Sequence, residues 1–270
     1  MSKDLMEALA RGASGSEWLV KIRDLTVLRV APQVSMVFAC DALGGIGMKP
    51  LDLVRASAET VGHFSLRVPL LEVLCAGAKP FLVMDTLSVE VGEYGLAILA
   101  GIKRLAAEAG LVADAHFNGS MEKNVSPKQT GVGVTVAGMA QGDLPLCVSR
   151  PGDAVLLVGV PKSAPTHEVR IGDSDIVSVQ EVLWLREQQG VHDMVPVGSR
   201  GARLEAQDLA ASSHTELVLD AVWMGTNDVD DSGGPHTAVL VACDAGSVSR
   251  LRVGLQSPVS VIGELIEMGV

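Results

Sequence analysis

The stretch FNGSMEKNVSPKQTGVGVTVAGMA, residues 117–140, says more about the fold than any other part of the chain. Val132, Val134 and Val136 alternate with small or polar residues, which predicts a strand with one buried face. The two glycines that flank Val132 fall on the opposite face, where the missing side chains let a ligand or another backbone approach closely. We therefore expect a half-buried strand that is entered from a polar loop.

The loop before this strand carries one acid, Glu122, and two lysines, Lys123 and Lys128, among other hydrogen-bonding side chains. Ammonium groups offset negative charge, so a loop of this composition suits a polyphosphate. The same residues are compatible with an ordinary surface loop that enters a glycine-containing core strand. Taken alone, the segment leaves both interpretations open.

The bulk composition limits the classes of partner. The chain has 270 residues, a formal net charge of -11 and only three Trp, one Tyr and four Phe. Nucleic-acid binding needs clustered cations and stacking platforms, so we expect no nucleic-acid partner. The longest apolar runs, such as AVLLVGV at 154–160, are too short to span a bilayer, so we expect no membrane partner.

The cellular compartment is also suggested by the sequence. The N-terminal residues MSKDLMEAL lack the apolar segment of a signal peptide. The four cysteines are widely spread, show no CxxC pattern and sit among apolar or small residues. These features favour a cytoplasmic protein whose thiols are reduced and packed in the core.

Apolar periodicity predicts helices separated by strands, an α+β mixture. In the first half we expect helices over 1–12, 51–64, 65–77 and 92–110, and strands over 35–41, 77–90 and 111–117. In the second half an apolar run over 154–160 begins a new block, and we expect an amphipathic helix over 175–190 and strands over 216–224 and 237–243. Two prolines and two glycines in 141–152 mark a connector, which divides the chain into residues 1–145 and 146–270.

A second group of polar residues follows the strand SMVFACD. Asp41 closes that strand and precedes the glycine-rich turn GGIGMKP at 44–50, which contains Gly47 and Lys49. An acid, a flexible turn and a lysine can hold a divalent cation and a phosphate together. Alternatively, Asp41 caps the turn and Lys49 is simply exposed.

Two further acids interrupt apolar segments. Glu72 lies in the helical stretch VPLLEVLCAGAKP, and a carboxylate there needs either a partner or a helix face that reaches solvent. Asp85 lies in the apolar strand FLVMDTLSV, so it is paired, at an edge or functional. The polar loop GTNDVDDSGGP at 225–235 lacks the spacing of a calcium-binding EF-hand and is expected to be a solvated turn or a ligand-covering loop.

Taken in order, these segments resemble the ATP-dependent superfamily of aminoimidazole ribonucleotide synthetase, selenophosphate synthetase and thiamine monophosphate kinase. The resemblance rests on the acid-ended strand, the glycine turn with lysine, the helix in which Glu72 precedes GAKP, and the glycine-rich segment 117–140, and it covers residues 34–165 well. The segment GSMEKN followed by QTGVGVTV looks most like the α-ribazole kinase branch. Where family members carry GGDT, this chain has NGSM, so Ser120 replaces an acid.

The resemblance implies a two-half PurM-like fold: an N-terminal α/β half that binds ATP and pairs its sheet across a homodimer, and a C-terminal α+β half. It implies a kinase that transfers phosphate from ATP to the ribose hydroxyl of α-ribazole, a small-molecule nucleoside, in cobalamin lower-ligand salvage. The implied Mg²⁺ ligands are Asp41, Glu72 and Glu122, and the catalytic residues are Asp85, Glu122 and Lys123. The implied ATP-binding residues are Asp41, Gly47, Lys49, Asn118, Gly119, Ser120 and Lys128.

Two alternatives remain beside this hypothesis. The same fold can serve another acceptor, such as thiamine monophosphate, selenide or a formylglycinamidine-like amide. The missing acid at Ser120 also leaves room for a nucleotide-binding scaffold dimer without catalysis.

Overall fold

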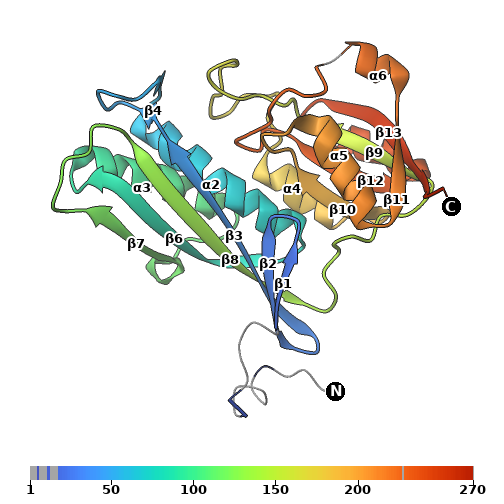
Figure 1. The fold of residues 1–270 in the computed structure, drawn as a ribbon, viewed down its shortest axis with the longest axis horizontal. Coiled ribbons are helices and arrows are strands. Elements are labelled where there is room, and N and C mark those ends of the chain that lie inside the picture. Colours follow the sequence, from blue (N-terminus) through green and yellow to red (C-terminus); the bar gives the residue numbers. More distant parts are fainter. Residues whose placement is uncertain (1–4, 6–10, 13–17, 227, 270) are drawn as a thin grey trace. The chain divides into compact units, whose positions relative to one another are not determined.

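The chain divides into two compact units, residues 1–144 and 145–270, shown in Figure 1. This computed structural model describes residues 5, 11–12, 18–226 and 228–269. The helix expected over residues 1–12 therefore falls almost entirely outside the described residues. Among the described residues, no helix is both long enough and apolar enough to cross a membrane.

The N-terminal unit is built on a six-stranded sheet in the order β1-β2-β3-β8-β6-β7. All neighbouring pairs are antiparallel except β6 and β7, which are parallel. The strands are β1 (Leu19–Ile22), β2 (Leu25–Ala31), β3 (Val34–Gly44), β6 (Lys79–Glu90), β7 (Phe117–Glu122) and β8 (Gly131–Gln141). A short parallel pair, β4 (Ile46–Gly47) and β5 (Val54–Arg55), follows β3.

Two helices, α2 (Ala58–Cys75) and α3 (Glu93–Glu108), cover one face of this sheet (Figure 1). Their backbones touch because Gly62 lies against the Ile98 carbonyl and Gly101 against the Glu59 carbonyl, where any side chain would clash. α2 is buried on nearly every side, and its C-terminal part, from Val68 to Cys75, is apolar apart from Glu72.

The structure corrects three expectations in this unit. The two helices expected over 51–77 are the single helix α2, which begins where Ser57 caps the Thr60 amide at 3.2 Å. The segment 111–117 is not a strand but a turn and the 3₁₀ helix η2 (Asp114–His116). Conversely, FNGSME forms strand β7 rather than part of a loop.

Side chains of the sheet alternate between two faces, as the pleat requires. Val132, Val134 and Val136 are buried on the helix-covered side, as the alternation predicted. The opposite side, called the open face below, is lined by exposed side chains: Cys40, Ala42, Thr86, Ser88, Asn118, Ser120 and Met139. Cys75 and Cys243 are buried as expected, but Cys40 is an exposed thiol on this face.

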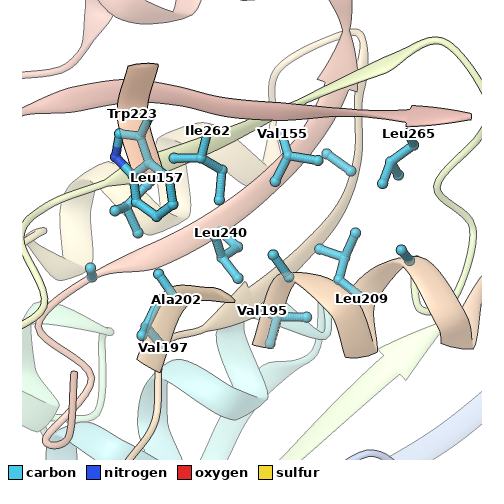
Figure 2. Close-up of a cluster of buried hydrophobic side chains, with 14 residues drawn as sticks. Val155, Leu157, Val195, Val197, Ala202, Leu209, Trp223, Leu240, Ile262 and Leu265 are labelled. Carbon is cyan, nitrogen blue, oxygen red and sulfur yellow. The ribbon is translucent and has the colours of Figure 1, made fainter. Parts of the chain in front are cut away.

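The C-terminal unit holds a five-stranded antiparallel sheet in the order β10-β12-β9-β13-β11. The strands are β9 (Asp153–Val158), β10 (Val191–Pro196), β11 (Thr215–Leu219), β12 (Val239–Asp244) and β13 (Val259–Glu267). The helices are α4 (Val179–Arg186), α5 (Gly201–Ser212), α6 (Ala221–Thr226) and α7 (Val248–Gly254), with the 3₁₀ helix η3 (Ala245–Ser247) before α7. Figure 2 shows the core between the sheet and α5, in which Leu209 and Leu240 are fully buried.

Capping side chains explain where helices begin in this unit. The helix expected over 175–190 is the shorter α4, which starts at a capping box between Ser178 and Glu181. The strand expected over 216–224 ends at Leu219, because the Asp220 carboxylate accepts a hydrogen bond from the Trp223 amide at 2.8 Å and starts α6.

Candidate functional site

Three connections meet at one end of the N-terminal sheet. The Gly45 amide donates to the Thr130 carbonyl at 2.9 Å, the Leu51 amide to the Lys128 carbonyl at 3.0 Å, and the Val91 amide to the Glu122 carbonyl at 3.2 Å. We call residues 45–55, 90–94 and 122–130 the rim. Five of the expected site residues lie in it: Gly47, Lys49 and Lys128 from the ATP set, Glu122 from the metal set, and the catalytic residues Glu122 and Lys123.

Asp52 organises the rim, although the sequence analysis did not single it out. Its carboxylate accepts the Thr130 amide at 2.8 Å, the Thr130 hydroxyl at 2.7 Å and the Lys49 amide at 2.7 Å. Burial acts to raise the pKa of Asp52, but the hydrogen bonds from Thr130 and Lys49 outweigh it and the pKa is lowered. These bonds hold residues 51–57 out of the helix that their periodicity predicted.

Gly47 is surrounded by protein atoms. A Cβ at this position would overlap the Tyr94 hydroxyl, the Thr130 hydroxyl and the Asp52 carboxylate, and its φ of +152° favours glycine. The Tyr94 hydroxyl also accepts a hydrogen bond from the Met48 amide at 3.0 Å. Gly47 is therefore needed to pack the rim, whatever it does for a ligand.

Lys49 is buried and its ammonium pairs with the Glu90 carboxylate. The hydrogen bond from Lys49 lowers the pKa of Glu90. Lys49 is therefore not an exposed side chain, and Glu90 already balances its charge inside the rim. Asp41 also differs from expectation, because β3 continues past it to Gly44.

Glu122 and the two lysines lie on the solvent side of the rim. Glu122 Oε1 accepts the Asn124 amide at 2.7 Å and the Val125 amide at 3.2 Å. These hydrogen bonds lower the pKa of Glu122, so the carboxylate is ionised at neutral pH. Lys123 and Lys128 are exposed, and the rim therefore offers solvent both an anion and cations.

One row of residues crosses the sheet on its helix-covered side. Asp41 and Asp85 both pair with Val134, and Asp85 also pairs with Gly119. Two strand spacings, roughly 10 Å, separate the backbones of the two aspartates. Asp85 is 5% exposed; burial raises its pKa to about 6, against smaller opposing effects of its own backbone amide and Lys103.

The remaining predicted residues are spread out. Asn118 and Ser120 lie on the open face of β7. Glu72 is far from Asp41. Its neighbour Val73 lies against Gly138 of β8, whereas Asp41 pairs with Val134 of the same strand. Four residues, or roughly 13 Å along the strand, separate Gly138 from Val134. Within one chain, the structure does not bring Asp41, Glu72 and Glu122 into one cluster.

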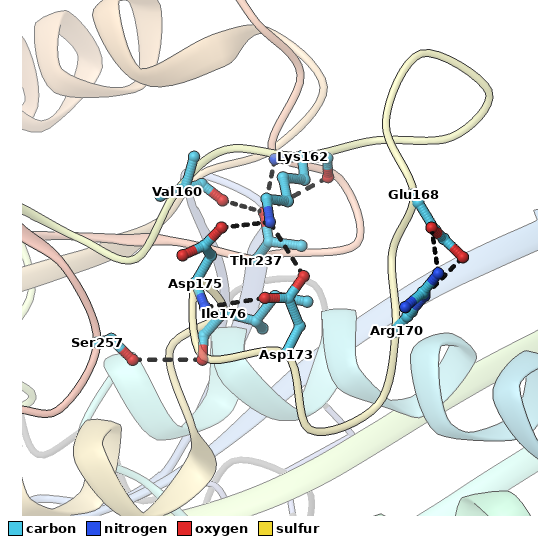
Figure 3. A network of polar contacts seen from close by, with 9 residues as sticks. All are labelled: Val160, Lys162, Glu168, Arg170, Asp173, Asp175, Ile176, Thr237 and Ser257. Carbon is cyan, nitrogen blue, oxygen red and sulfur yellow. Dashed lines mark hydrogen bonds and ion pairs between the residues drawn. The ribbon is translucent and has the colours of Figure 1, made fainter.

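The C-terminal unit has its own polar network in the connection between β9 and α4, shown in Figure 3. Lys162 Nζ pairs with Asp173 at 3.0 Å and Asp175 at 2.5 Å, and the Lys162 amide donates to the Thr237 hydroxyl at 2.8 Å. The hydrogen bond to Asp175 is the main reason that the pKa of Lys162 is raised. His167 Nε2 lies 3.5 Å from Asp231, which links this connection to the polar loop at 228–234.

The comparisons with known proteins concern the fold. No protein-family model matches this sequence, and no curated protein matches it. The thiamine-monophosphate kinase from Stenotrophomonas maltophilia K279a has a similar structure, with a TM-score of 0.66 and 16% identity over 98% of this chain and 93% of that one. The chain has the PurM-like fold.

Two further solved structures agree. HypE of E. coli, a hydrogenase maturation protein, gives a TM-score of 0.64 at 16% identity, covering 98% of this chain and 91% of its own. AaThiL complexed with AMPPCP and TMP gives 0.62 at 14% identity, covering 98% and 90%. The mixed α and β PurM-like fold expected from the resemblance is therefore confirmed, and the chemistry is argued separately below.

Proposed function

We propose that this protein is an ATP-dependent small-molecule kinase that phosphorylates the ribose hydroxyl of α-ribazole. The observation that carries the proposal is the fold, which is similar to that of a thiamine-monophosphate kinase over nearly the full length of both chains. A second similar structure, AaThiL, holds AMPPCP together with TMP. The α-ribazole acceptor rests on the segment GSMEKN followed by QTGVGVTV.

The rim supplies the charges that this reaction needs. Phosphoryl transfer depends on positioning and on electrostatic stabilisation of the transferring group. In our proposal Lys123 and Lys128 neutralise the phosphates, because both are exposed at the rim. Lys49 already pairs with Glu90 and stabilises the rim. Its ammonium can contact a phosphate only if it breaks the ion pair with Glu90.

Mg²⁺ fits the rim if the phosphates of ATP and water supply most of its ligands. The three expected ligands do not form a cage, but Mg²⁺ is usually held by one or two carboxylates together with phosphates and water. We assign Glu122, at the rim, as the protein carboxylate and place Asp41 and Glu72, which the chain does not bring near it, outside the set. The ion would offset the charge that develops on the transferring phosphoryl group.

Asp85 is the proposed general base. A base works best when its pKa lies close to the operating pH, and burial has moved the pKa of Asp85 to about 6. Gly119 faces this carboxylate without a side chain of its own. Asn118 and Ser120 lie on the other face of the same strand, and we assign them to nucleotide contacts made there.

We also propose that two copies of the chain pair their open faces as a homodimer. Exposed apolar and small groups on this face, among them Met139 at 47% exposure and Ala42, are suited to burial against a second copy. The paired sheets would bring Asn118 and Ser120 of each copy to the interface.

A different acceptor is favoured by one observation, which is the presence of TMP in a structure of this fold. A panel of acceptors separates the candidates: the purified protein is incubated with ATP, Mg²⁺ and α-ribazole, thiamine monophosphate or ordinary ribonucleosides. Products are identified by the mass of an added phosphoryl group. The proposal predicts phosphorylated α-ribazole; phosphorylation of thiamine monophosphate alone would replace it with the second acceptor.

The variant Glu122→Gln distinguishes a catalytic kinase from a protein that only binds ATP. The amide oxygen can still accept the Asn124 and Val125 amides, so the turn is kept while the charge is lost. A catalytic role predicts loss of turnover with ATP binding retained. A wild-type protein that binds ATP but never turns it over would instead be a scaffold.

A further inference from the structure

A second polar site lies in the C-terminal unit, at the end of its sheet where β9 and β10 begin and β12 ends. Among the described residues, this is where three potential metal ligands come together: Asp153, His192 and Asp244 offer one atom each within 4.8 Å of one another. None of the three belongs to the rim. They come from three strands that antiparallel pairing places side by side.

Asp153 fixes the orientation of His192. Both Asp153 carboxylate oxygens lie 2.9 Å from His192 Nδ1, and Asp153 is only 3% exposed. A carboxylate accepts a hydrogen bond, so the ring proton is placed on Nδ1. The other ring nitrogen, Nε2, then faces Asp244. A carboxylate behind a histidine in this way is the usual support of a metal-binding imidazole.

The distance on the other side of the ring is the deciding observation. His192 Nε2 lies 3.5 Å from Asp244 Oδ1, which is too long for a normal hydrogen bond. Ligands bound at about 2.0–2.1 Å in a tetrahedral site lie roughly 3.3 Å apart, so a metal ion fits between these two atoms.

The space beside this pair is kept open by a glycine. Gly190 has a φ of +80°, and a Cβ there would lie 2.7 Å from Asp244 Oδ2 and 2.5 Å from Ser247 Oγ. The Ser247 hydroxyl lies beside the same glycine, and Arg250 Nη2 approaches it at 3.5 Å. The Asp244 side chain is 59% exposed, which gives an ion a route in and lets water complete its coordination.

We propose that Asp153, His192 and Asp244 form a binding site for a divalent transition metal of the Zn²⁺ class. His192 Nε2 and Asp244 are the ligands, and Asp153 is the positioning residue. Imidazole nitrogen favours Zn²⁺, Co²⁺ or Ni²⁺ over Mg²⁺ and Ca²⁺, which prefer oxygen ligands. Cys243 takes no part, because it directly precedes Asp244 in β12 and its side chain therefore points to the opposite face of the sheet.

Calorimetric titration of the metal-free, full-length protein with Zn²⁺ tests the site, with excess Mg²⁺ present to occupy sites made of oxygen ligands. The wild type is expected to bind one Zn²⁺ ion. Asp244→Asn, at an exposed position that folding tolerates, is expected to weaken binding at least tenfold, and Asp153→Asn by 10- to 100-fold. Visible absorption of the Co²⁺ form gives a second readout of the coordination geometry.

The matched control is Asp231→Asn. Asp231 also lies 3.5 Å from a histidine Nε2, that of His167, in the same unit, but no three-residue cluster of potential ligands includes it among the residues that the structure describes. This variant should bind Zn²⁺ as the wild type does, and thermal unfolding confirms that each variant is folded. Zn²⁺ binding that is unchanged in Asp244→Asn, or that is missing in the wild type, overturns the proposal.

Discussion

Asp85 and Gly119 are register partners on the parallel strands β6 and β7, and the Asp85 carboxylate fills the space in which a Gly119 side chain would lie. The glycine in NGSM therefore has a packing reason in this chain. It lets a buried acid stand between two strands on the helix-covered side of the sheet. The same arrangement keeps water away from the carboxylate, which is why its pKa is raised.

Gly119→Ala should destabilise the protein by about 1–3 kcal/mol, the usual cost of forcing an extra methyl group into a packed site. The cost should fall in the double variant with Asp85→Ala, because the clashing carboxylate is then gone. Urea unfolding of both single variants and the double variant measures the coupling. Additive free energies would mean that the two side chains do not compete for the same space.

Asp85→Asn should change how stability depends on pH. The pKa of Asp85 is raised from 3.8 to about 6 in the folded protein, so the folded state holds the proton more tightly than the unfolded state. Stability is therefore lost as pH rises through this window, by up to roughly 3 kcal/mol. Asp85→Asn has no carboxyl group to titrate at this position, so its stability should not fall with pH for this reason.

Unfolding free energies measured from about pH 4 to about pH 7 check this prediction. The wild type should lose about 2–3 kcal/mol more than Asp85→Asn over the interval. At neutral pH the variant should then be as stable as the wild type or more stable, while its turnover is lost. Parallel curves for the two proteins would show that Asp85 titrates normally.

Asp52→Asn tests the organisation of the rim. The amide group cannot accept all three hydrogen bonds from Thr130 and Lys49, so a buried donor is left without a partner. We expect a loss of about 1–3 kcal/mol in unfolding free energy. Asp114→Asn is the control, since its carboxylate is exposed and pairs only at the surface with Lys103, which predicts a change below about 1 kcal/mol. Equal effects at the two positions would remove the special role of Asp52.

Some of the fold could be predicted because local patterns and tertiary packing agree. The alternation of Val132, Val134 and Val136 predicted β8, and all three side chains are buried. The apolar steps in residues 92–110 predicted α3. In β8 the periodicity of the sequence matches the face that the structure buries. In α3 it marked the helix but not the whole buried face, which includes Ile98, Ile102 and Leu105 but not the exposed Leu96.

Other elements depend on contacts that no local pattern reveals. Strand β7 has a polar, glycine-containing sequence and is extended because it pairs with β6. Residues 51–57 have a helical pattern but are held in a loop by bonds from residues far along the chain to Asp52.

The candidate sites also divide into one that the local sequence reveals and one that depends on tertiary pairing. Glu122, Lys123 and Lys128 could be found because they are neighbours in one loop, which the structure places at the rim. The cluster of Asp153, His192 and Asp244 could not, because its members lie on three separate strands and only the pairing of those strands brings them together. Spacing in the sequence carries no trace of that pairing.

Thr86→Lys tests the proposed homodimer. Thr86 is exposed on β6 in the middle of the open face, so a lysine in each copy would place like charges at the interface. Light scattering should show a dimer for the wild type and a monomer for the variant. Leu96→Lys on the exposed side of α3 is the control and should remain a dimer. A wild-type monomer at all concentrations would contradict the pairing of open faces.

The central claim is transfer of the γ-phosphoryl group of ATP to a ribose hydroxyl. Simultaneous measurement of ADP and of phosphorylated nucleoside, with ATP, Mg²⁺ and α-ribazole, tests it most directly. The account predicts that the two products form in equal amounts with the wild type and that neither forms with Glu122→Gln. ATP that binds to the wild type but yields neither ADP nor any phosphorylated acceptor would contradict it.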